Sequence, residues 1–94
     1  MNLDELKNIE SPKGLETDYL KAIWYDLHDD LHEAHRIVQR LNTVSAMWIH
    51  AYLHREEGDI PNSKFWYSSA DKEYPGNLTF ADEIEIILNE LTKN

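Results

Sequence analysis

The 94-residue chain contains no cysteine, only three glycines and three prolines, and nine basic residues against 18 acidic ones. Without cysteine, neither a disulfide framework nor a thiolate metal site can form, so packing alone must hold the core. The formal net charge of -9 opposes binding to nucleic acid and to anionic membrane surfaces, because both attract basic proteins. We therefore expect neither nucleic acid nor a membrane among the partners.

Long apolar runs are also missing from the chain. No stretch approaches the roughly 18 apolar residues that indicate a membrane-spanning helix, and residues 1–10 are acidic, unlike a secretory signal. What is present is the ordinary balance of a globular domain, with 41% hydrophobic and 29% charged residues. These features predict a soluble, cytoplasmic protein with one core.

Apolar residues recur at the three-and-four spacing of helices in most of the chain, and no alternating pattern indicates a strand. The sequence therefore predicts an all-α fold in a single domain, residues 1–94. Antiparallel helical hairpins are expected over residues 17–41 and 44–70, with a capping helix over residues 79–92. Residues 1–14 are expected to form a short helix that frays.

The second hairpin is the centre of the predicted fold. Its first helix is apolar around the whole circumference, which is typical of a buried helix, and Ser45 is expected to cap it. Gly58 can adopt the left-handed conformation that closes a helix, and Asp59 with Pro61 starts the next one. The pattern predicts two antiparallel helices joined by a tight turn.

Three consecutive aromatic residues, Phe65, Trp66 and Tyr67, follow on the second helix of this hairpin. Consecutive residues on a helix point in different directions, so the three rings cannot all face one core. We expect at least one ring near the surface, and we predict an interface at Phe65 and Trp66.

Two resemblances support the helical prediction. The second hairpin resembles a tetratricopeptide repeat, with matching small, turn, aromatic and helix-ending residues at Ala51, Gly58, Asp59, Ser63, Tyr67, Ala70 and Pro75. The chain is also similar to a small uncharacterised microbial family of helical proteins, through the motifs His35-x-Ile37-x-Gln39 and Trp48-x-His50-Ala51-x-x-His54-x-x-Glu57-Gly58-Asp59-x-x-Asn62-x-x-x-Trp66-Tyr67. The first resemblance implies a protein-binding scaffold, and the second implies a fold but no reaction.

All five histidines lie between residues 28 and 54. His50 and His54 are four residues apart on the buried helix, and Glu57 extends the same face by three, which suits a divalent metal. His35 is expected to approach from the adjacent helix. Because Ala51 follows the first histidine where a zinc protease has its glutamate, the spacing excludes that protease motif.

The alternative interpretation of these histidines is a structural hydrogen-bond network that holds two helices in register. The partners expected in that case are Glu57, Asp59, Asn62 and Tyr67. A third interpretation is a pH switch, because clustered imidazoles can titrate near neutrality.

The remaining acidic residues, Glu83 among them, are expected to form a solvated face. No complete catalytic signature is present. The first functional hypothesis is therefore a non-enzymatic module that binds a protein or peptide, or a second copy of itself, and that needs no cofactor. The alternative is a small metal-binding protein or metal-dependent enzyme that uses His35, His50, His54 and Glu57.

Overall fold

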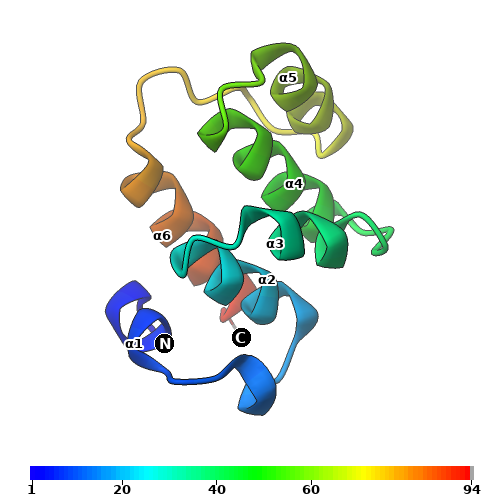
Figure 1. Cartoon of the computed structure of the whole chain (residues 1–94). Helices are drawn as coiled ribbons and strands as arrows, with labels where there is room; N and C mark the ends of the chain where they lie inside the picture. Colours follow the sequence, from blue (N-terminus) through cyan, green and yellow to red (C-terminus); the bar gives the residue numbers. More distant parts are fainter. Residues whose placement is uncertain (94) are drawn as a thin grey trace.

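The computed structural model describes residues 1–93, and within that range the chain is all-α, as predicted, without a β-strand. No helix in this range is long and apolar enough to cross a membrane. Six α-helices and one short 3-10 helix follow one another along the chain (Figure 1): α1 (Leu3–Asn8), η1 (Pro12–Gly14), α2 (Asp18–Leu27), α3 (Leu31–Val38), α4 (Val44–Glu56), α5 (Ile60–Ser69) and α6 (Phe80–Leu91).

Two pairs of consecutive helices form the most extensive contacts, α2 with α3 and α4 with α5. The turn between α2 and α3 contains Asp29 in the left-handed region, at φ 63°, and Gly58 adopts φ 85° between α4 and α5. A residue with positive φ ends a helix by turning the chain back, so both pairs are tight hairpins. The predicted hairpins are therefore present, whereas their tetratricopeptide-like stacking stays a prediction.

Side-chain caps explain where the helices begin. Asn2 and Glu5 form a reciprocal capping box at α1, and Thr79 accepts from the backbone of Asp82 at α6. The prediction of Ser45 as the cap of α4 was wrong. Thr43 has this role, because its extended backbone lets Oγ1 accept from the N–H of Ala46 at 3.1 Å.

Helix α4 is the centre of the molecule and contacts α2, α3, α5 and α6. Small residues allow α5 to approach it closely. Ser63 is completely buried and donates a hydrogen bond from Oγ to the carbonyl of Ala51 at 3.0 Å. This bond satisfies a buried hydroxyl and fixes the register of the two helices.

Helix α6 lies between α1 and α4 in Figure 1 and packs against both. Ile84, Ile87 and Leu88 bury its apolar face in the core. Helix α1 contributes Leu6, which is completely buried, and the indole N–H of Trp24 donates to the carbonyl of Ile9 at 2.8 Å. The N-terminal segment is thus joined to the core by packing and by a hydrogen bond.

Candidate metal centre

Three histidines meet where α3 crosses α4. His35 comes from α3, and His50 and His54 come from successive turns of α4. One ring nitrogen from each of the three lies within 4.8 Å of the others. In a tetrahedral zinc site with bonds of about 2.0–2.1 Å, the nitrogens are about 3.3 Å apart, so closing by about 1.5 Å or less would complete the geometry.

The rings have a defined arrangement. His50 and His54 are nearly parallel, with centroids 4.8 Å apart and planes 19° apart, as their four-residue spacing allows. The ring of His35 stands edge-on to both, at 82° to His50 and 65° to His54. One helix therefore supplies two imidazoles, and the neighbouring helix supplies a third from the side.

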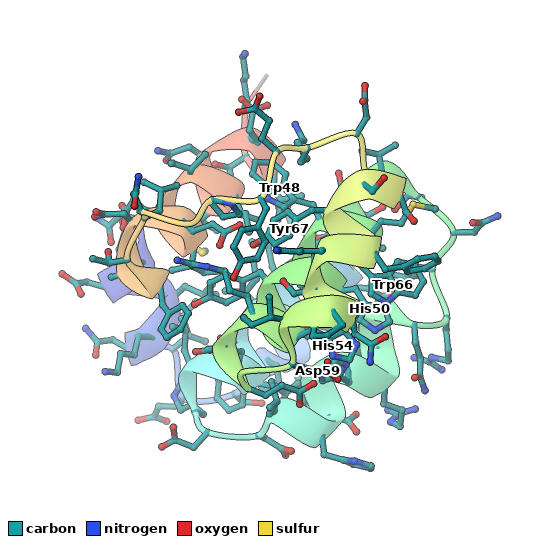
Figure 2. The ribbon with its side chains drawn as sticks, turned by 90° about the horizontal axis from the view of Figure 1, so that it is seen from above. Trp48, His50, His54, Asp59, Trp66 and Tyr67 are labelled. Atoms are coloured by element: carbon teal, nitrogen blue, oxygen red, sulfur yellow. The ribbon has the colours of Figure 1, made fainter. Side chains whose placement is uncertain are left out.

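Trp66 of α5 covers the cluster on the His50 side. Its ring stacks on His50 with centroids 4.2 Å apart and planes 18° apart. Figure 2 shows Trp66, His50, His54 and Asp59 following one another along one side of α5. Packing between α4 and α5 thus holds the ring of His50 between Trp66 and His54.

Two carboxylates stand on the other side of His54. Its Nδ1 lies 2.5 Å from Oε1 of Glu57 and 3.9 Å from Oδ2 of Asp59. The second oxygen of Glu57, Oε2, lies 3.9 Å from Nε2 of His35. A hydrogen bond from Nδ1 to Glu57 leaves Nε2 of His54 as the nitrogen with a free lone pair.

His35 carries the most informative atom of the cluster. Its Nε2 is buried and has no hydrogen-bond partner among residues 1–93, since 3.9 Å from Glu57 is too long for a hydrogen bond. Buried polar side-chain atoms are rarely left without a partner. An unpartnered imidazole nitrogen beside two other imidazoles is the arrangement that a metal ion satisfies.

The surroundings also favour the neutral imidazoles that metals require. Burial, followed by the neighbouring His54 and His35, lowers the pKa of His50 to about 4. Burial and His54 lower the pKa of His35 as well, while Glu57 opposes that shift. Both rings are therefore uncharged near pH 7 and keep a lone pair for coordination.

A cavity of about 310 Å³ opens beside the cluster. Its lining residues are His32, His35, Arg36, Gln39, His54 and Glu57. A metal bound by the three histidines would therefore have solvent access on this side.

The structure brings together the predicted His35, His50, His54 and Glu57. His28 is separate, because it ends α2 before the turn at Asp29, and its ring stacks on Trp24 with centroids 3.9 Å apart. The predicted polar network of Asp59, Asn62 and Tyr67 is only partly present. Nδ2 of Asn62 donates to Asp59 at 2.7 Å, next to the cluster.

The prediction of Tyr67 as a partner of the histidines was wrong, because its hydroxyl donates to Glu83 instead. Figure 2 shows Tyr67 with Trp48 on the opposite side of α5 from the histidines, since residues 66 and 67 diverge around the helix. The predicted interface residues also differ from each other. Phe65 is 60% exposed, whereas Trp66 is half-buried on His50.

Glu83 was predicted on the solvated face, and this was wrong, because only 2% of it is exposed. Its Oε1 accepts from Nη1 of Arg55 at 3.0 Å, and its Oε2 accepts from Nε1 of Trp48 at 3.3 Å and from Tyr67. These contacts join α4, α5 and α6 through one buried ion pair. The proton of Tyr67 is retained, since burial and Glu83 raise its pKa.

Two carboxyl groups, of Asp26 on α2 and Glu56 on α4, interact where no sequence pattern predicted a contact. Burial, and then the hydrogen bond and charge of Asp26, raise the pKa of Glu56 to about 9. Burial also raises the pKa of Asp26. The Oε1 atom of Glu56 is buried without a partner among residues 1–93, and the raised pKa keeps this carboxyl group protonated at neutral pH.

The chain matches no protein-family model, no curated protein sequence and no solved structure. The two resemblances inferred from its motifs therefore stay predictions.

Proposed function

We propose that the protein binds a divalent transition metal through His35, His50 and His54. The observation that carries this proposal is the buried Nε2 of His35, which has no hydrogen-bond partner within residues 1–93 and lies in a group of three imidazoles whose nitrogens are within 4.8 Å. In a purely structural network, each buried nitrogen would have its own partner.

Zinc is one of the metals that this donor set suits. Imidazole suits zinc, copper, nickel and iron, and the absence of cysteine leaves no thiolate to favour softer ions. Glu57, which the sequence analysis placed among the ligands, instead supports His54 through Nδ1. A carboxylate behind a ligating histidine fixes its tautomer and raises its basicity.

Three protein ligands leave one position of a tetrahedral site open. Structural zinc sites use four protein ligands, whereas catalytic sites keep a position for water or substrate. The cavity of about 310 Å³ beside His35 and His54 gives room for such a ligand. The donor count and the cavity therefore favour an accessible centre over a purely structural one.

Calorimetric titration of the metal-free protein with zinc tests the proposal. We expect one zinc per chain in the natural protein and loss of that site in His35→Ala, His50→Ala and His54→Ala. His28→Ala is the control that should keep it, because His28 lies outside the cluster and its ring stacks on Trp24. Absence of stoichiometric zinc in the natural protein, or equal loss in the control, would overturn the proposal.

A second candidate is self-association through the exposed ring of Phe65. Its 60% exposure on α5 favours this hypothesis, because a large aromatic residue on the surface often marks an interface. Light scattering coupled to size exclusion would measure the oligomeric state of the natural protein and of Phe65→Ser. A dimer that dissociates in the variant supports self-association, and a strictly monomeric natural protein contradicts it.

A further inference from the structure

A second cavity, of about 230 Å³, lies beside His50 and Trp66. The end of α3, the following connection and parts of α4 and α5 surround it. Its apolar wall consists of Val38, Leu41, Ala46, Met47 and Trp66, and its polar groups come from Gln39, Arg40, Asn42 and His50. The cavity therefore combines an apolar side with a short polar strip.

The volume limits the size of a ligand. A dry cavity of about 150 Å³ accommodates benzene, and sites for drug-sized molecules occupy about 300–1,000 Å³. A cavity of about 230 Å³ lies between these values. It suits a molecule with one ring, or a branched chain of similar size, and one small polar group.

Arg40 indicates that the small polar group of the ligand is negatively charged. Arg36 is paired with Glu33, and Arg55 is paired with Glu83. Among the described residues, Arg40 has no carboxylate within ion-pair distance, although the chain has twice as many acidic as basic residues. The charge of Arg40 also acts on Glu33, but among the described residues no acidic side chain lines the cavity, so Arg40 is the cationic group that a bound carboxylate would meet there.

We propose that this cavity binds a small monocarboxylate with an aromatic or branched aliphatic body, for which phenylacetate is a suitable probe. The carboxylate pairs with Arg40 and accepts from the amide of Asn42, while the body packs against Trp66, Met47 and Leu41. A fully polar anion such as inorganic phosphate is disfavoured, because the apolar wall would desolvate it without compensating hydrogen bonds.

This proposal goes beyond metal binding and does not depend on it. No lining residue except His50 belongs to the histidine cluster, so the metal-free chain should bind the carboxylate. The metal proposal can therefore fail while this one holds, and the reverse is also true. If both hold, the ligand lies directly against the ring of one metal ligand.

NMR titration of the metal-free, full-length protein tests the proposal. We expect phenylacetate to shift the amides of residues 38–42 and the indole N–H of Trp66 in a saturable manner. The indole signals of Trp24 and Trp48 should stay in place, because their N–H groups are bonded to Ile9 and Glu83. Acetate, benzyl alcohol and phosphate each lack the ring, the charge or the apolar body, and should bind at least about tenfold more weakly.

Arg40→Gln should weaken phenylacetate binding about tenfold, because it removes the charged partner. Arg36→Gln is the matched control one helical turn away, and it should bind phenylacetate like the natural protein. Trp66→Leu reports on the apolar wall and should also weaken binding. No saturable shift with phenylacetate, equal binding by Arg40→Gln, or equal binding of phosphate would overturn the proposal.

Discussion

Nδ1 of His54 lies 2.5 Å from Oε1 of Glu57, three residues further along the chain. This contact assigns the two nitrogens of His54 to different tasks, because Nδ1 donates to the carboxylate and Nε2 stays available. The same carboxylate reaches within 3.9 Å of His35. Glu57 is therefore positioned to orient the histidine cluster from outside.

The first prediction concerns this supporting role. Glu57→Gln should lower the affinity for zinc by about 10–100-fold, because an amide is a weaker acceptor for Nδ1 and holds the ring of His54 less firmly in the ligating orientation. The stoichiometry should stay at one zinc per chain. Competition titration with a chelating dye measures the change, and Glu90→Gln, an exposed glutamate on α6, is the control. Unchanged zinc affinity in Glu57→Gln would show that the carboxylate does not support the site.

The second prediction concerns the buried ion pair between Arg55 and Glu83. Glu83→Gln should reduce the free energy of unfolding by about 3–5 kcal/mol, because it leaves the guanidinium of Arg55 buried without its counter-charge. Urea denaturation followed by circular dichroism measures the loss. Glu90→Gln serves again as the control on the same helix, with an expected change of about 0.5 kcal/mol or less. A similar loss in both variants would contradict the assigned role of Glu83.

The third prediction concerns the loss of stability as the pH rises from about 5 to 9. In the folded protein the pKa of Glu56 is raised to about 9, whereas an unfolded glutamate titrates at about 4.3. Between these values the folded state holds a proton that the unfolded state has released, so stability falls as the pH rises through this window. Glu56→Gln should flatten that decline in urea denaturation between about pH 5 and pH 9. An unchanged decline in the variant would assign it to other groups.

The fourth prediction concerns acidic conditions and metal-free protein. The pKa of His50 is lowered to about 4 in the folded state, against about 6.5 when unfolded. The unfolded chain therefore binds a proton first, and stability should be lost as the pH falls from about 6.5 to 4. His50→Phe keeps a ring for Trp66 to stack on and should reduce this loss. His28→Ala should show the same acid-side loss as the natural protein, and a His50→Phe curve identical to the natural one would contradict the prediction.

Much of the fold follows from local patterns in the sequence. The apolar spacing predicted both hairpins, Gly58 and Asp59 predicted the turn of the second one, and the spacing of His50, His54 and Glu57 placed them on one face of a helix. Spacing does not give the orientation of a side chain. Glu57 was predicted as a metal ligand from its spacing, and the structure places its Oε1 2.5 Å from Nδ1 of His54, so direct binding of a metal by Glu57 stays a prediction.

Contacts between distant residues were harder to predict. Glu83 is 28 residues from Arg55, and no local pattern connects them. The sequence contains one indication that Glu83 is buried. Glu83 lies three residues after Phe80 and four before Ile87, on the apolar face of α6. A glutamate there has to be buried with a partner. The position of Glu56 indicates burial in the same way, because it lies four residues after Tyr52 on the buried helix α4.

The most direct test of metal binding is a crystal structure of the zinc-loaded protein with anomalous diffraction at the zinc edge. We expect one peak per chain, about 2.0–2.1 Å from one nitrogen of each of His35, His50 and His54. Oxygens of Glu57 should lie behind His54, outside the zinc coordination sphere. A peak at other residues, or no peak in crystals grown with excess zinc, would contradict the central claim.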